Sequence, residues 1–321
     1  MAYWMVLSVQ AIFAIYQLMA KVAFERYAVD PLVFAFTRTA GASMVLFLMS
    51  AVLVPWHKFV PREGYRWQFL LMGVSMFGNV VGLVFALSLT SSASTAMLQV
   101  LRPIFAGILS WTLGLEKPTM LKVTGMAICV VGGMAVTEFS DTANATARQP
   151  YLGALLVCLH ALSISVYVVH QPILVEAGHS AIAINAISYA IATLFIGILI
   201  AMPSLRAYHH GIWFDGSPLY ICLTLHSIFL VASWSYVTMA WSARRLGGTV
   251  VMLFMLLQMV CLLIAGRYVL GEVIHPGQAA GGLLVVVGIL IFAFAPSTPT
   301  VQLWTELEKG RKASERDKLH R

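Results

Sequence analysis

The chain consists of long apolar runs that are interrupted by short polar or turn-forming breaks. A helix of about 20 mostly apolar residues is long enough to cross the hydrocarbon core of a bilayer. Runs of this kind cover residues 2–24, 31–54, 67–89, 92–115, 119–138, 151–174, 181–202, 217–241, 247–271 and 277–295. The sequence therefore predicts an all-α, polytopic membrane protein with ten transmembrane helices.

Composition excludes the soluble alternatives. Of the 321 residues, 60% are hydrophobic and 10% are charged, whereas soluble domains carry roughly 25% charged residues. An ordinary soluble enzyme, a disordered chain and a nucleic-acid-binding module are excluded, despite the net charge of +7. The four cysteines lie inside apolar runs without CxxC spacing, so we expect no disulfides and no bound metal. They are Cys129, Cys158, Cys222 and Cys261.

Basic residues in the loops and at the span ends next to them predict the orientation, because Lys and Arg gather on cytoplasmic loops. With the N-terminus inside, thirteen such residues fall inside and three outside. The inside residues are Lys58, Arg62, Arg66, Lys117, Lys122, Arg244, Arg245, Lys309, Arg311, Lys312, Arg316, Lys318 and Arg321; the outside residues are Arg26, Arg148 and Arg206. We expect both termini in the cytoplasm, in the plasma membrane or an endomembrane. The sequon at Asn144 then lies outside.

A shift of 156 residues aligns the two halves of the chain. It places Glu116 on Glu272, Gly125 on Gly281, and the run Val130–Gly132 on 286–288. Ten spans divide into five plus five, and an odd number per repeat inserts the second copy upside down. Inverted repeats of this kind surround the site of alternating-access carriers.

This division predicts the domain organisation. Residues 1–138 form the first five-helix repeat, 139–150 an external linker, and 151–295 the second repeat. Residues 296–321 form a charged cytoplasmic tail.

The halves resemble the EamA repeats of the drug/metabolite transporter superfamily. The resemblance lies in LQVLRPIFAGILSWTLGLEKP with VTGMAICVVGGM, and in MLFMLLQMVCLLIAGRYVLGE with GGLLVVVGIL. Arg38 stands where these repeats often carry an arginine, and LHALSISVYVVHQPIL is similar to the plant Walls-Are-Thin and nodulin-like branch. Met259 departs from the pattern, because the second repeat often has a proline there; the first keeps Pro103. The resemblance implies a carrier of amino acids, purines, auxin-like acids or other metabolites, often in the export direction.

No catalytic or energy-coupling motif accompanies these repeats. A P-loop, a GxSxG elbow and an HExxH pair are all missing, so the sequence predicts a carrier without enzymatic activity or cofactor. The alternatives are a nucleotide-sugar or phosphorylated-metabolite exchanger and, less favoured, a membrane enzyme or scaffold. We expect a small-molecule substrate and the lipid bilayer as partners, no nucleic acid, and a monomer or weak dimer.

Polar side chains inside the spans mark the candidate substrate site, because each is costly in hydrocarbon unless it is paired or faces water. Thr95, Gln99 and Arg102 share one helical face of the fourth span. A guanidinium binds carboxylates in bidentate geometry, so Arg102 is interpreted as an anion contact, with a structural tether as the alternative. The repeat shift maps Arg102 onto Gln258.

The remaining candidates lie on four other spans. They are Gln10, Asn79, His160, Ser163, Tyr167, Trp234 and Tyr236. Trp234 is either a substrate contact or an interfacial anchor, and the stripe of His160, Ser163 and Tyr167 is either a site or a helix-packing surface. We expect His160 to be a neutral, hydrogen-bonded group, with proton coupling as the alternative.

Charged residues near the span ends have a different interpretation. We expect Lys21 and Arg38 to form a rim network with Glu25 and Asp30. Glu116 and Glu272 are interpreted as capping and turn residues, with a coupling acid as the alternative.

Overall fold

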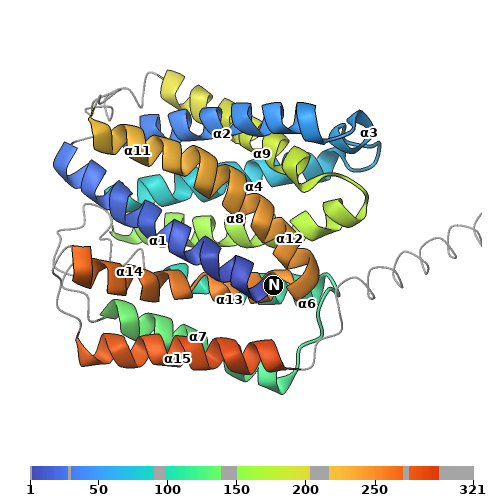
Figure 1. Cartoon of the computed structure of the whole chain (residues 1–321). Helices are drawn as coiled ribbons and strands as arrows, with labels where there is room; N and C mark the ends of the chain where they lie inside the picture. Colours follow the sequence, from blue (N-terminus) through green and yellow to red (C-terminus); the bar gives the residue numbers. More distant parts are fainter. Residues whose placement is uncertain are drawn as a thin grey trace, which may run out of the picture.

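The computed structural model describes residues 2–27, 30–89, 98–138, 150–202, 217–269 and 275–295, and all regular elements within them are helical. The first half contributes α1 (Ala2–Tyr27), α2 (Pro31–Leu53), α3 (Trp56–Phe59), α4 (Arg66–Leu89), α6 (Leu101–Thr112) and α7 (Met120–Glu138). The second contributes α8 (Pro150–Glu176), α9 (Ala181–Ala201), α11 (Pro218–His226), η2 (Ser227–Ser235), α12 (Tyr236–Leu246), α13 (Gly248–Phe254), α14 (Leu257–Val269) and α15 (Pro276–Phe294). The predicted all-α class is confirmed (Figure 1).

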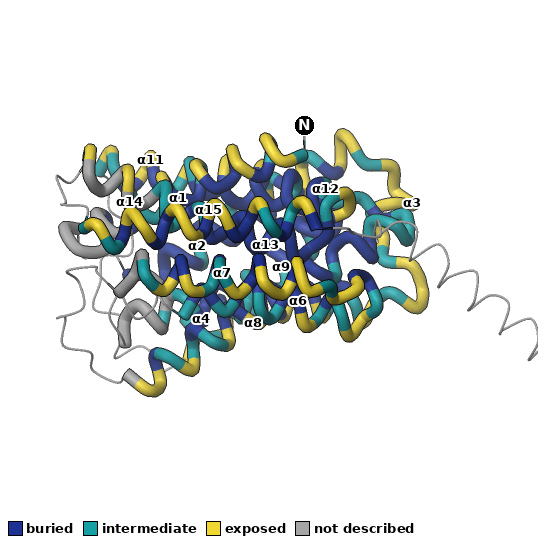
Figure 2. The backbone as a smooth tube through the Cα atoms, turned by 90° about the horizontal axis from the view of Figure 1, so that it is seen from below, coloured by how far each residue is buried: buried dark blue, intermediate teal, exposed yellow. Residues whose placement is uncertain are grey.

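Six stretches of the described residues are long and apolar enough to cross a membrane. They are Ala2–Ala20, Leu32–Leu53, Tyr151–Glu176, Ala181–Ala201, Pro218–Leu246 and Pro276–Phe294. The outer surface of the bundle is apolar as well: Trp4, Met44 and Val52 are 74%, 63% and 83% exposed. Buried residues run through the interior and exposed ones lie on the outer faces (Figure 2). A surface this apolar suits hydrocarbon and not water.

Several helices begin where a polar cap precedes a proline, which has no N–H to satisfy in the first turn. Asp30 Oδ1 accepts hydrogen bonds from the backbone N–H groups of Leu32 and Val33, and Pro31 follows it. Ser217 caps α11 in the same way. Its hydroxyl accepts a hydrogen bond from the backbone N–H of Tyr220, and Pro218 is the first residue of the helix. These turns place the starts of the helices where the sequence breaks predict them.

Two long apolar runs are each broken at equivalent positions. A turn at Val100 precedes α6, and a turn at Met255–Leu256 separates α13 from α14. The helices after the breaks begin at Leu101 and Leu257, which the 156-residue shift superimposes. Pro103 lies in the first turn of α6, where proline is tolerated, and not in mid-helix. Both runs are interrupted although only the first contains a proline, so the break does not depend on that residue.

Helices α7 and α15 pack backbone to backbone through glycines (Figure 1). A Cβ on Gly125 would lie 2.9 Å from Gly288 O, and one on Gly132 would lie 2.7 Å from Gly281 O. Between these contacts the Cys129 thiol donates to Val285 O at 3.5 Å. The glycines that the repeat shift aligned are therefore the ones that let the two helices touch.

Replacing Gly132 with Ala is expected to destabilise the bundle. The new Cβ meets backbone atoms on both Gly281 and Val285 at 2.7 Å, which cannot move without shifting the helix. Overpacking of this kind costs about 1–3 kcal/mol. Thermal unfolding of the purified protein in detergent measures the effect.

Gly282→Ala is the matched control, because its Cβ meets only the side chain of Val260 at 3.5 Å. It should leave the melting temperature close to that of the unsubstituted protein. Equal melting temperatures for the two variants would contradict the close packing of α7 on α15.

Candidate functional site

A buried group of polar side chains centres on Arg102, in the first turn of α6. Its side chain is 4% exposed. Arg102 Nη2 donates to Gln99 Oε1 at 2.6 Å and to His160 Nε2 on α8 at 2.7 Å. The Ser165 hydroxyl, also on α8, donates to the carbonyl of Arg102 at 2.8 Å. Arg102 thus ties the two halves of the chain together.

These contacts define the protonation state of His160. A guanidinium only donates hydrogen bonds, so His160 Nε2 must accept from Arg102. His160 Nδ1 then carries the proton and donates to the backbone carbonyl of Asn79 on α4 at 2.6 Å. The geometry requires the neutral imidazole, which agrees with the expectation of a hydrogen-bonded histidine and leaves no free nitrogen for proton coupling in this conformation.

Asn79 extends the group towards α12. Its Nδ2 donates to the hydroxyl of Tyr236 at 3.2 Å, and both residues are buried. Tyr236 directly follows η2, a π-helical stretch in which Ser233 and Ser235 donate to the carbonyls five residues before them. A π-helical turn shifts the residues after it around the helix axis. Tyr236 points into the bundle, while Trp234 is 52% exposed.

A set of tyrosines surrounds Tyr236. The ring centroids of Tyr167 on α8 and Tyr189 on α9 each lie 5.8 Å from its ring, at close to right angles. The Tyr167 hydroxyl donates to Asn185 Oδ1, which also accepts from Gln171 Nε2 at 3.2 Å. Sequence reasoning missed Asn185 and Tyr189, although their i, i+4 spacing places both on one face of the span 181–202.

Arg38 lies in the interior, so the prediction of a rim network is wrong for this residue. Its side chain is 8% exposed, and Nη1 donates to the hydroxyl of Tyr16 on α1 at 2.6 Å. The Asp30 carboxylate caps α2. The side chains of Lys21 and Glu25 lie outside what the structure describes.

The other predicted site residues fall into different surroundings. Gln10 is fully buried, and its amide donates to Val6 O within α1. Gln258 is 3% exposed with an unpartnered Oε1, and no described hydrogen bond joins it to Arg102. Ser163 packs against Gly78, where a Cβ would lie 2.5 Å from its hydroxyl. Thr95 and Glu272 lie outside the described residues.

A second buried polar group lies at the end of the bundle where α3 is found. Glu116 and Lys122 form an ion pair at 3.2 Å and are 6% and 2% exposed. Gly247, with φ +90°, approaches so closely that its Cβ would lie 2.5 Å from Glu116 Oε1. Glu116 thus pairs with a lysine of its own half and packs against the α12–α13 junction, which gives it a structural role.

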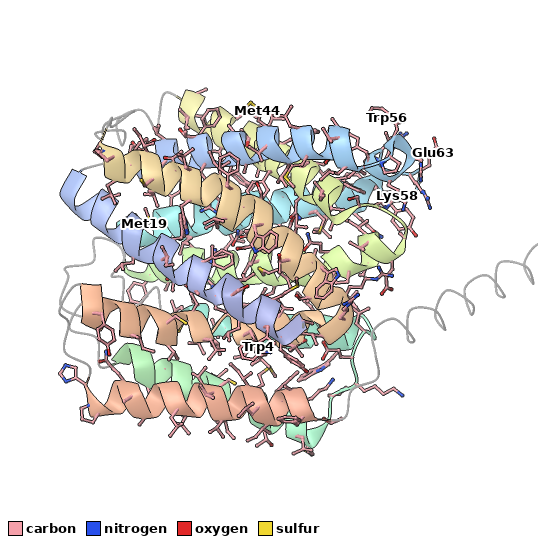
Figure 3. The ribbon with its side chains drawn as sticks, viewed as in Figure 1. Trp4, Met19, Met44, Trp56, Lys58 and Glu63 are labelled. Carbon is pink, nitrogen blue, oxygen red and sulfur yellow. The ribbon has the colours of Figure 1, made fainter. Side chains whose placement is uncertain are left out.

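The same end holds the other loops that carry basic residues. Ser180 N donates to Lys58 O at 3.1 Å, and Arg62 Nη1 donates to Ala177 O at 3.0 Å. Arg244 pairs with Glu176 at 3.9 Å. Lys58 and Glu63 lie beside Trp56 at this end (Figure 3).

Replacing Glu116 with Gln is expected to lower stability strongly. Lys122 would keep a buried ammonium without its carboxylate, and breaking one partner of a buried pair costs about 3–5 kcal/mol. Membrane abundance and the melting temperature in detergent should both fall.

Glu63→Gln is the control, because the Glu63–Arg66 pair is exposed, at 93% and 73% of the side chains. That variant should behave as the unsubstituted protein does. A Glu116→Gln variant of unchanged stability would show that the buried pair is dispensable.

The described helices define an integral, multi-pass membrane protein whose apolar core contains groups of buried polar side chains. The model of the EamA-like transporter family matches residues 1–137 and 151–294. The chain belongs to this family, whose members are membrane transporters of small solutes. The Walls-Are-Thin branch stays a resemblance of the sequence alone.

The fold is also that of a known structure. A solved structure titled "Crystal structure of protein" is 16% identical and covers 90% of this chain and 94% of its own, with a TM-score of 0.70. At this identity the likeness concerns the fold alone.

Proposed function

We propose that the protein is a secondary carrier that moves small organic metabolites across a membrane by alternating access. The observation that carries this proposal is that both halves of the chain contribute residues to the interior polar cluster of Arg102, His160, Asn79 and Tyr236. Arg102 and Asn79 come from the first matched segment, and His160 and Tyr236 come from the second. A carrier needs a site shared by two units that rock against each other.

The packing of α7 on α15 supports inverted repeats, with five of ten spans in each. Gly125 meets Gly288 and Gly132 meets Gly281. The 156-residue shift maps Gly125 onto Gly281 and Gly132 onto Gly288, so it turns one of these contacts into the other. It also maps Cys129 onto Val285, its own hydrogen-bond partner. Reciprocal contacts of this type are the mark of a two-fold relation.

The broken helices support the location of the site. Discontinuous helices at corresponding places of two repeats commonly line the binding site of a carrier. Arg102 and Gln258 each follow the break of their own helix by the same number of residues. Thr95 and Gln99 precede the first break, so we include them in the proposed site together with the interior tyrosines. Trp234 is not part of the proposed site, because its side chain is 52% exposed.

Both termini are proposed to be cytoplasmic, because the loops that carry Lys58, Arg62 and Arg244 gather at one end of the bundle. Tags at the two termini should be accessible only from the cytosol. A tag inserted within 203–216, which the sequence predicts to be an outside loop, should be accessible only from outside. A terminus labelled from outside would contradict the ten-span arrangement. Residues 139–149 of the predicted linker, with Asn144, and the tail at 296–321 lie outside the described residues.

Uptake by the purified protein in liposomes tests the function. Radiolabelled amino acids, purines and aromatic acids form the panel, and empty liposomes give the background. At least one class should enter saturably. Arg102→Gln should reduce uptake of that solute about tenfold or more, because the charge-assisted contact to the solute, or the contact that holds His160, is lost. Arg102→Lys should reduce it less, because the positive charge remains.

Arg66→Gln is the control, because the Arg66 side chain is 73% exposed. Uptake of none of the solutes would contradict the carrier function. Unchanged uptake by a folded Arg102→Gln variant would show that Arg102 does not contact the solute and has only a structural role between the helices.

Exchange of nucleotide sugars or phosphorylated metabolites is the second candidate. It is favoured by two buried guanidiniums, those of Arg38 and Arg102, which have no carboxylate partner among the described ion pairs. Uptake that requires a phosphorylated solute inside the liposome would select this candidate.

A further inference from the structure

Arg38 lies among aromatic side chains in the interior of the bundle. Its guanidinium carbon is 4.8 Å from the centre of the Tyr16 ring, and Nη1 donates to the Tyr16 hydroxyl. Tyr189 and Tyr236 are near enough to interact with it electrostatically. These residues come from α1, α2, α9 and α12, so both halves of the chain surround the charge.

The hydrogen-bonding capacity of Arg38 is largely unused. A guanidinium has five N–H donors, and the described partners of Arg38 are two tyrosine hydroxyls, those of Tyr16 and Tyr189; the buried Nε has no partner. No carboxylate forms an ion pair with Arg38 among the described residues. A buried charge in a membrane protein is expensive, and it is retained mainly at functional sites.

Arg102 differs from Arg38 in the kind of partner it has, although its buried Nε is also without one. Its Nη2 has two neutral acceptors, Gln99 Oε1 and His160 Nε2, at 2.6 and 2.7 Å. The protein itself therefore supplies partners for Arg102. The described partners of Arg38 are only tyrosine hydroxyls, which can themselves donate to a bound anion.

A further unsatisfied donor lies beside Arg38. The Tyr189 side chain is fully buried, and its hydroxyl, which interacts with Arg38, donates to no described acceptor. Tyr189 is also 5.8 Å, centroid to centroid, from Tyr236, whose ring meets Phe13 at 5.9 Å. Unused donors and apolar ring faces thus occur together.

We propose that Arg38, Tyr16, Tyr189 and Tyr236 form a subsite that binds the carboxylate of the solute, and that the solute is an organic monocarboxylate with a flat apolar body. The planar fork of a guanidinium matches a carboxylate, the Tyr189 hydroxyl donates to the same group, and the rings of Tyr236 and Phe13 pack on the body. This inference rests on the proposed function.

The charge of the subsite favours a carboxylate over a phosphate ester. One guanidinium neutralises one negative charge, whereas a phosphate monoester carries between one and two near pH 7. The tyrosines shield the subsite from water in the described conformation, so the solute enters when the bundle opens.

Binding of four related probes to the purified full-length protein in detergent tests the subsite. Phenylacetate carries both the carboxylate and the ring, phenylacetamide lacks the charge, acetate lacks the ring, and benzylphosphonate replaces the carboxylate. Phenylacetate should bind saturably, and the other three about tenfold or more weakly.

Variants locate the binding to Arg38. Arg38→Lys keeps the charge and loses the fork, so the Kd for phenylacetate should rise about tenfold; Arg38→Gln should raise it further. Tyr189→Phe removes only the hydroxyl and should raise the Kd about threefold to tenfold. If Arg38→Gln fails to fold, the Lys and Phe variants carry the test.

Arg245→Gln is the matched control. Arg245 also lies on an aromatic ring, 3.8 Å from the centre of Trp241, but it is exposed. Its replacement should leave the Kd unchanged.

Three results would overturn the subsite: equal binding of phenylacetamide, tighter binding of benzylphosphonate, or an unchanged Kd in Arg38→Lys. If phenylacetate fails while another solute of the uptake panel is transported, the subsite is wrong and the carrier function stands. If nothing is transported, the carrier function itself is wrong.

Discussion

The structure depends on one constraint: a polar group inside hydrocarbon must find its partner within the protein. The chain Arg102–His160–Asn79–Tyr236 meets it by linking four helices through hydrogen bonds of 2.6–3.2 Å. Each member of this chain is a hydrogen-bond partner that its neighbour requires, so the cluster holds α4, α6, α8 and α12 in a defined arrangement. The partners come from both matched segments, so any motion between the segments must act on this cluster.

Close helix packing and helix breaks serve this arrangement in complementary ways. Glycines on α7 and α15 remove side chains where the two backbones meet, which ties the halves together at one edge of the bundle. The breaks before α6 and α14 place Arg102 and Gln258 in the first turns of helices that start inside the bundle. A firm contact at the edge and interrupted helices in the interior suit two units that move around a shared site.

Much of the fold could be read from hydropathy and turn chemistry. Asp30–Pro31 and Ser217–Pro218 begin helices as their sequences predict, because capping is a local property of a few residues. The 156-residue repeat also pointed to the glycines of the α7–α15 contact. The π-helical stretch before Tyr236 was not predictable, since no local pattern distinguishes Ser227–Ser235 from an ordinary helix.

The sequence by itself marked Asn79, Arg102 and His160 as polar side chains inside apolar spans, where a polar group must be paired or face water. Only the tertiary structure decided what each one does. Hydrogen-bond partners more than twenty positions apart, such as Arg38 with Tyr16 and Arg102 with His160, are set by how the helices rotate and cross. The spacing of residues along one helix carries no information about that rotation, so the arginine that binds an amide and a histidine and the arginine that binds tyrosines look alike until the bundle is assembled.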